Sequence, residues 1–321
     1  MAIKHPPFDP ELAAVIERGE TPSFQILPEH IPMLRMETEK EAPSNTELER
    51  NGAITVREIS IPSSTDGFDI SILMLTPTQS GGDRPGLLFI HGGGMVAGSA
   101  RSGGLEHILD WAQELGIAVA SVDYRLAPEH PDPIPVEDCY AALRWVDAQR
   151  TALGIDRAPL MIAGMSAGGG LAAGLALLAR DRRGPAIAAQ ILICPMLDDR
   201  QTMPSSLLDG IGVWDRTSNN TGWTALLGDR KGMAEVSPYA APARATDLSG
   251  LPPAFLDVGA VEVFRDEVID YAARLMQAGV SAELHVWAGA FHGFDSFAPH
   301  AAVSKSARDA RLAYLRRRLK R

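Results

Sequence analysis

Short apolar runs that alternate with amphipathic segments constrain the fold of this 321-residue chain more than any other feature. Each run is four to six residues long and almost wholly apolar. Strands that helices cover on both faces have this composition, because neither face meets water. The runs lie at residues 87–90, 117–122, 160–163, 188–193 and 253–258.

Helix-like segments lie between and after these runs. Residues 105–116, 136–154 and 264–280 carry apolar side chains at the three-to-four spacing of a helix that packs on one face. The first two end in glycine, the residue that most often terminates a helix. Repeated strand and helix predict an α/β fold with a mostly parallel central sheet flanked by helices.

Two segments upstream have a different pattern. Residues 55–62 and 68–77 alternate apolar and polar side chains with a period of two, and the turn-rich stretch SSTDG separates them. This arrangement predicts an antiparallel hairpin that leads into the sheet.

Two regions do not fit the alternation, and we expect them to form a helical cap. The N-terminal part, residues 1–48, begins a helix at Asp9, where a capping side chain precedes a proline. The second part, residues 200–240, holds Trp214 and Trp223 and interrupts the core. The core would then comprise residues 49–199 and 241–321. The two tryptophans could line a substrate pocket or form the cap's own small core.

Charge and terminal sequence restrict the partners and the location. The net charge of −10 disfavours a nucleic-acid partner, which would need a basic face. We interpret the C-terminal basic cluster as a solvated last helical turn. The first ten residues lack the pattern of a secretory signal, so we expect a cytoplasmic protein. The cluster comprises Arg316, Arg317, Arg318, Lys320 and Arg321.

Residues 160–179 contain no charge, which on length alone meets the criterion for a membrane span. Their glycines and the serine indicate two short buried elements joined by a tight turn, so we expect no membrane partner. We interpret Cys139 and Cys194 as buried thiols, because neither has a second cysteine or a histidine cluster beside it.

Residues 164–168 read GMSAG and fit the pattern G-x-S-x-G, between an apolar strand and a helix of small residues. A strand that turns sharply into a helix exposes the side chain at the turn, and its neighbours must be small because the backbone doubles back. The helix also places its positive end under the serine. Ser166 is therefore the candidate nucleophile.

Residues 91–94 read HGGG and directly follow the first apolar run. Glycines at this place allow backbone N–H groups to approach a developing oxyanion, which any Cβ would obstruct. A loop of this kind followed by a nucleophile turn is typical of an α/β-hydrolase.

A serine nucleophile needs a base, and the base needs a carboxylate that orients it. His292 lies in a glycine-flanked loop after the last strand-like segment, whereas His285 lies inside that segment and is expected to be packed. Glu262 lies in the loop after residues 253–258 and is the preferred acid. Asp257, Asp266 and Glu267 are alternatives, the first within the strand and the others in the first turn of a helix.

Five motifs in this order, HGGG, DYRLAPEHP, GMSAGGG, GAVEVFRDE and FHGF, resemble the hormone-sensitive-lipase-like carboxylesterases, the bacterial family IV esterases. The resemblance covers residues from about 50 to the end and implies an α/β-hydrolase core with a helical cap. It implies Ser166 as nucleophile, His292 as base and Glu262 as acid, and oxyanion N–H groups from Gly93, Gly94 and Ala167. It also implies structural roles for Tyr124, Arg125 and Glu129 beside the oxyanion loop.

The sequence indicates no long exposed apolar surface for a lipid interface, so we expect hydrolysis of short to medium acyl esters, and the triad chemistry calls for no metal or organic cofactor. The resemblance implies a possible homodimer through the last strand, near residues 282–287. An amidase or a lactonase could use the same triad, and a non-catalytic receptor on the same fold is disfavoured because His292 is present. Two positions depart from the family pattern. Met165 stands where the family usually has aspartate or threonine, and Glu262 stands where aspartate is usual.

Overall fold

A computed structural model describes residues 5–22, 25–63, 66–79, 83–155 and 158–320 of the chain. Its centre is one eight-stranded sheet with the strand order β1-β2-β4-β3-β5-β6-β7-β8. The first two strands pair antiparallel with each other, and β2 pairs antiparallel with β4, while all other neighbours are parallel. The strands are β1 (Ile54–Pro62), β2 (Asp69–Pro77), β3 (Gly86–Ile90), β4 (Ala118–Asp123), β5 (Leu160–Met165), β6 (Gln190–Ile193), β7 (Ala254–Gly259) and β8 (Ala282–Trp287).

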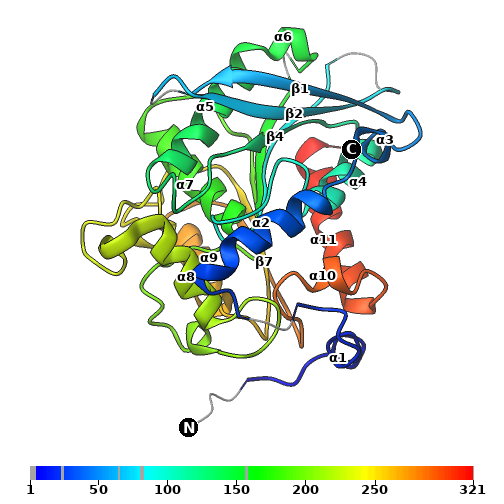
Figure 1. Ribbon diagram of the computed structural model, residues 1–321. Coiled ribbons are helices and arrows are strands. Elements are labelled where there is room, and N and C mark those ends of the chain that lie inside the picture. The colour runs from blue at the N-terminus through cyan, green and yellow to red at the C-terminus, as the bar shows by residue number, and fades with distance from the viewer. Residues whose placement is uncertain (1–4, 23–24, 64–65, 80–82, 156–157, 321) are drawn as a thin grey trace.

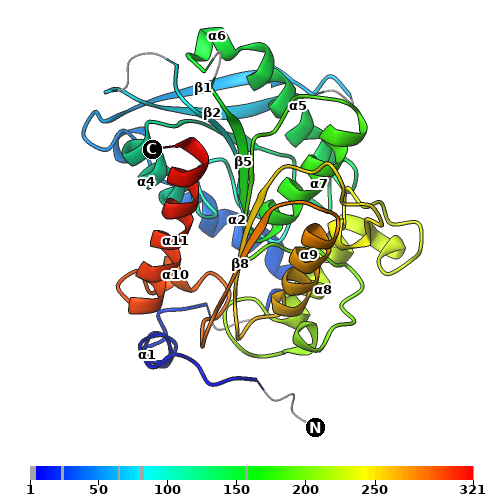
Figure 2. The ribbon, with the colours of Figure 1, turned by 180° about the vertical axis from the view of Figure 1, so that it is seen from behind.

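Helices cover both faces of this sheet, as Figures 1 and 2 show from opposite sides. On one face, α4 (Leu105–Leu115) and α11 (Ala302–Leu319) pack against side chains such as Phe89. On the other face, α5 (Ile134–Ala148), α7 (Ala167–Asp181) and α9 (Arg265–Gln277) pack against side chains such as Leu88. Successive residues of a strand point to opposite faces, so each strand contributes to both cores. The predicted α/β fold is confirmed.

The remaining helices are short or peripheral. They are α1 (Pro10–Glu17), α2 (Ile31–Lys40), α3 (Asn45–Leu48), α6 (Arg150–Leu153), α8 (Arg216–Leu227) and α10 (Phe294–Phe297), with 3-10 turns η1 (Pro28–His30), η2 (Pro204–Leu207), η3 (Gly228–Arg230) and η4 (Pro242–Arg244). The helix expected over residues 136–154 is divided between α5 and α6, because the backbone of Gln149 leaves the helical region. The predicted hairpin is β1 and β2; residues 64–65 of its turn lie outside the described residues.

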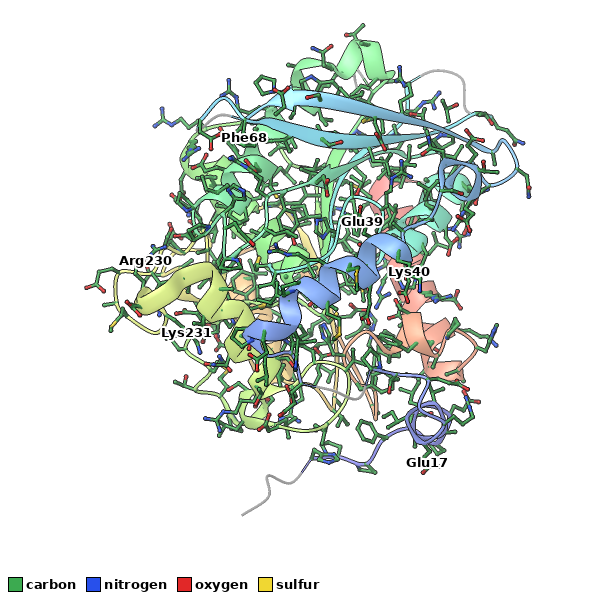
Figure 3. The ribbon with its side chains drawn as sticks, viewed as in Figure 1. Glu17, Glu39, Lys40, Phe68, Arg230 and Lys231 are labelled. Carbon is green, nitrogen blue, oxygen red and sulfur yellow. The ribbon has the colours of Figure 1, made fainter. Side chains whose placement is uncertain are left out.

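The N-terminal helices lie on different parts of the core. The backbone N–H of Asp9, before α1, donates to the carbonyl oxygen of Gly289 at 3.0 Å, and Leu12 belongs to the same hydrophobic cluster as Phe291 and Phe294. Helix α2 crosses the front of the molecule in Figure 1. Glu39 and Lys40, labelled in Figure 3, belong to its last turn and are exposed to solvent.

The segment that holds the two tryptophans contacts the N-terminal region. Gln25 Nε2 donates to Asp215 Oδ2 at 2.6 Å, and the backbone N–H of Ile26 donates to Ser218 Oγ at 3.0 Å. Asp215 also caps α8. Residues far apart in the sequence therefore pack as neighbours on this side of the sheet.

Ion pairs account for part of the C-terminal basic cluster. Arg316 pairs with Glu114 and Arg317 with Glu283, at the end of α11, while Arg321 lies outside the described residues. Cys139 and Cys194 are both buried and free, as predicted. Among the described helices, none is both long and apolar enough to cross a bilayer.

Candidate active site

Ser166 forms the turn between β5 and α7. Its φ of 57° and ψ of −120° lie outside the regions that residues with a side chain prefer, a strain of about 1–3 kcal/mol. Hydrogen bonds fix the turn on both sides: the Ser166 N–H donates to Ile193 O at 2.8 Å, and its carbonyl oxygen accepts from Gly170 N at 3.1 Å. The side chain is consequently held at the strand end, at the positive end of α7.

The small residues around Ser166 allow close approach of backbones. A Cβ on Gly164 would overlap the backbone of Gly168, and one on Gly168 would overlap the carbonyl oxygens of Ile90 and His91. Farther along α7, a Cβ on Gly170 would overlap the Met196 carbonyl. The turn, α7 and β3 therefore pack against one another at distances that larger residues would prevent.

Ser166, His292 and Glu262 form a continuous chain of hydrogen bonds. His292 Nε2 lies 2.9 Å from Ser166 Oγ, and His292 Nδ1 lies 3.0 Å from Glu262 Oε1. With its proton on Nδ1, the imidazole donates to the carboxylate and accepts from the serine hydroxyl. The backbone N–H of Gly259 donates to Glu262 Oε2 at 2.9 Å, and the Phe264 ring lies edge-on to the imidazole at 5.1 Å. Less than a tenth of each of the three residues is exposed.

Asp257 belongs to a different buried group. Its Oδ2 accepts from Arg311 Nε at 2.7 Å and from Trp287 Nε1 at 3.1 Å. Arg311 also pairs with Asp295, and both residues of this second pair are buried. Burial raises the pKa of Asp257 although Arg311 opposes the shift. The carboxylate thus joins β7 to α11.

The two acids in the first turn of α9 also have other partners. Asp266 accepts from Ser205 N at 2.8 Å and pairs with Arg265. Glu267 is buried and accepts from Leu197 N at 2.7 Å, and burial raises its pKa well above the usual value. The remaining histidine candidate, His285, is part of β8, where it stacks on Trp287.

The glycine loop after β3, residues 92–94, has positive φ angles at two positions, a backbone conformation that favours glycine. Gly93 and Gly94 have φ angles of 119° and 64°, and Gly93 O accepts from Val96 N and Ala97 N at 3.1 and 3.0 Å. Within the described residues, the N–H groups of Gly93, Gly94 and Ala167 donate to no protein acceptor. A Cβ on Gly94 would overlap the ring of Trp214, so the indole covers this loop.

Tyr124 and Glu129 support the loop as the resemblance implied. The Tyr124 hydroxyl donates to the His91 carbonyl at 3.1 Å, and its ring stacks on that of His91. Glu129 pairs with Arg35 of α2, and Arg35 Nε donates to Val96 O at 2.7 Å. Sequence reasoning missed Arg35, since nothing in its neighbourhood in the chain indicates a partner 61 residues away.

Arg125 is the third residue to which the resemblance gave a structural role, and it pairs with the fully buried Asp138. It also pairs with Asp66 in the turn between β1 and β2. Its contacts thus join the hairpin to α5.

A pocket of about 720 Å³ opens above Ser166 and His292. The glycine loop forms one side, and Leu34, Glu37 and Thr38 of α2 also line it. Trp214 lines the pocket, whereas Trp223 is fully buried in the large core cluster. Both tryptophans belong to this large cluster and not to a separate small core of the cap, and Trp214 alone also lines the pocket. Met165 lines the pocket as well.

Glu262 and His292 also belong to a group of three buried side chains whose atoms are of the kind that bind metals. Ligand atoms of Cys194, Glu262 and His292 lie within 4.8 Å of one another. Burial raises the pKa of the Cys194 thiol well above its usual value. Hydrogen bonds already satisfy Glu262 and His292.

Comparison with known proteins places this geometry in a family. The family described as alpha/beta hydrolase fold matches residues 87–296. The chain belongs to the α/β-hydrolase fold family. Within it, the chain falls in the hormone-sensitive-lipase-like group that the five motifs indicated.

Among the relatives, carboxylesterase NlhH of Mycobacterium tuberculosis is 35% identical over 271 residues, which cover 82% of this chain and 84% of the relative. Ethyl acetate hydrolase of Pseudomonas putida is 30% identical over 302 residues, covering 89% and 91%. The solved structure of a bacterial heroin esterase superimposes with a TM-score of 0.88 at 41% identity, covering 97% of this chain and 98% of the other.

Proposed function

We propose that this protein is a serine carboxylesterase that hydrolyses short to medium acyl-chain esters through an acyl-enzyme intermediate. The observation that carries the proposal is the chain of hydrogen bonds from Ser166 through His292 to Glu262 at the floor of a pocket. The named relatives are carboxylic ester hydrolases, which supports the same reaction class.

In the first half of the reaction, Ser166 Oγ attacks the ester carbonyl carbon while His292 Nε2 takes the hydroxyl proton. Glu262 keeps the imidazole in the tautomer that accepts this proton and stabilises the positive charge that forms. The N–H groups of Gly93, Gly94 and Ala167 would donate to the oxyanion, and one such donor contributes about 3 kcal/mol. The intermediate then expels the alcohol, which leaves with the proton from His292.

In the second half, water attacks the acyl-enzyme and His292 takes its proton. The second tetrahedral intermediate collapses, the carboxylic acid leaves, and Ser166 regains its hydroxyl proton. The residues named above supply every proton transfer, so the mechanism calls for no cofactor.

The decisive test is the rate of p-nitrophenyl butyrate hydrolysis by wild type and by Ser166→Ala. We expect a loss of roughly 10³-fold or more, because the nucleophile and its base act as a unit. Ser306→Ala, an exposed serine on α11, is the matched control and should hydrolyse the ester like wild type. Equal rates for Ser166→Ala and wild type would contradict the proposal.

Residues 1–48 and 200–240 form the cap in this proposal, between core segments 49–199 and 241–321. The hydrogen bonds from Gln25 to Asp215 and from Ile26 to Ser218 support a shared cap, and Leu34 and Trp214 bring both parts to the pocket. A series of p-nitrophenyl esters from acetate to laurate tests the proposed preference for short to medium acyl chains. The same preparation assayed with an anilide and a lactone separates the esterase from the other hydrolases.

The homodimer and the cytoplasmic location stay predictions. The strand β8 forms an edge of the sheet, and an unpaired edge is a ready surface for a second copy. Sedimentation of the wild type and of Val286→Lys, which places a charge on the 41% exposed side chain of this strand, tests the dimer.

A further inference from the structure

Met165, the residue directly before Ser166, has its side chain enclosed between two glycines of other loops. A Cβ on Gly104 would lie 2.6 Å from Met165 Sδ, and a Cβ on Gly293 would lie 3.6 Å from Met165 Cε. Both glycines have positive φ, of 100° and 69°, and they precede α4 and α10 as N-caps. The thioether therefore occupies space that exists because Gly104 carries no side chain, whereas Cε lies at an ordinary contact distance from the Cβ position of Gly293.

The space around Met165 is part of the substrate pocket. Met165 is 7% exposed and lines the pocket together with Ser166 and His292. Leu105 follows Gly104 on α4, and Phe297 lies 3.6 Å from a Cβ placed on Gly293. Both side chains line the same pocket, as do Leu48 and Leu109. The thioether thus lies between the nucleophile and the end of the pocket where these apolar side chains stand beside Glu47, Arg50 and Glu106.

The position of the imidazole decides which part of an ester approaches this end. The leaving alcohol must receive a proton from His292 Nε2, so the alkoxy oxygen of the substrate has to face His292. Met165 Cε approaches Gly293, the residue directly after His292. The acyl chain, on the other side of the carbonyl carbon, would extend toward Trp214 beside the glycine loop.

We propose that Met165 is a specificity-determining residue that limits the length of a flexible n-alkyl alcohol group, so that the wild type hydrolyses esters of long primary n-alkanols more slowly than esters of short ones. The inference rests on the proposed esterase function. Methionine suits this role because its unbranched side chain fills irregular apolar space. Removing Cγ, Sδ and Cε would open this end of the pocket, between α4 and α10, to a longer alkyl chain.

The test compares wild type and Met165→Ala on n-alkyl butyrates from methyl to octyl, with acid release followed in a pH-stat. Each additional methylene that the vacated space accepts should raise kcat/KM by about fourfold, the equivalent of about 0.8 kcal/mol. We expect the ratio of octyl to methyl butyrate to rise by roughly tenfold or more. The p-nitrophenyl acyl series, measured beside it, should keep its rank order.

Met161→Ala is the matched control. Met161 lies on the same strand and in the same core cluster but does not line the pocket, so its loss should lower stability without changing the alcohol profile. If Met165→Ala does not fold, Met165→Val removes Sδ and Cε and introduces a β-branched residue that suits a strand end.

Two outcomes would overturn the proposal: an unchanged alcohol profile in a folded Met165 variant, or a shift confined to the acyl series. Neither outcome bears on the proposed function, because that proposal fails only if Ser166→Ala retains the hydrolysis of p-nitrophenyl butyrate.

Discussion

Two buried carboxylates near the end of β7 have contacts that assign them opposite roles. Asp257 lies in the strand and bonds Arg311, whereas Glu262 lies in the following loop and bonds His292. Replacing each by its amide removes a charge and nearly preserves the shape. We expect Glu262→Gln to lose activity and keep its stability, and Asp257→Asn to lose stability and keep its activity.

The geometry around Glu262 gives the size of the first effect. Gly259 N–H donates to Glu262 Oε2, so the amide oxygen of a glutamine would take that position. The amide NH₂ would then occupy the position of Oε1, 3.0 Å from His292 Nδ1, and would favour the wrong tautomer. An amide in place of a triad carboxylate lowers kcat by roughly 10⁴-fold, which corresponds to about 5.5 kcal/mol.

The network around Arg311 gives the size of the second effect. Arg311 is 2% exposed, and removing one partner of a buried ion pair costs about 3–5 kcal/mol. Arg311 would keep Asp295, so we take the lower end, about 3 kcal/mol. Unfolding entropy of about 2.1 cal/mol/K per residue over 321 residues converts this to a fall in melting temperature of about 4–5 °C.

The assay measures initial rates of p-nitrophenyl butyrate hydrolysis at 25 °C and thermal unfolding by circular dichroism for both variants and wild type. Our reasoning is refuted if folded Asp257→Asn loses more than a hundredfold in kcat while Glu262→Gln stays within tenfold of wild type. The acid of the triad would then be Asp257.

Three further substitutions test other parts of the site. Burial raises the pKa of Glu267 in the folded protein. Above about pH 4.3 the unfolded chain therefore releases a proton that the folded chain keeps. The free energy of unfolding of the wild type consequently falls with rising pH until the raised pKa is passed. Glu267→Gln has no such group, and its melting temperature relative to wild type should increase from pH 5 to pH 8; a constant difference would contradict this. Gly94→Ala places a Cβ against Trp214 and should lower kcat by roughly 10²- to 10³-fold, the effect of losing one oxyanion donor, and a change below threefold would argue against that role. Arg35→Ala removes the bond to Val96 O and should destabilise the fold by about 1–3 kcal/mol in thermal unfolding, an expectation that an unchanged melting temperature would disprove.

The parallel strands could be predicted because their signal is local. A strand that is buried on both faces needs apolar side chains at every position, and residues 160–163 have this composition. The glycines around Ser166 then predict the tight turn that follows the strand. His292 and Glu262 could be predicted because each stands in a loop after a strand, and the ends of parallel strands meet at one edge. The order of the strands puts these loops together.

The alternatives to Glu262 could not be dismissed from the sequence. Nothing near Asp257 in the chain indicates Arg311, which reaches it from a helix 54 residues later. Likewise, the sequence explains Glu267 only as an acid near the N-terminus of a helix. In the structure its carboxylate accepts hydrogen bonds from the backbone N–H groups of residues 197 and 198. In both cases the role follows from a partner that tertiary packing supplies.

Paired positions explain the part of the site that local patterns leave undetermined. The ring of Trp214 occupies the space where a side chain on Gly94 would lie, and the thioether of Met165 occupies the corresponding space at Gly104. Each glycine permits a positive φ that its loop needs, and each also leaves a volume that a large residue fills from another segment. A substitution at one member of such a pair therefore changes which side chain fits at the other member. The shape of the pocket depends on both residues of each pair. Met165 departs from the family pattern when the serine motif is considered alone, and the space that Gly104 leaves for the thioether accounts for the methionine.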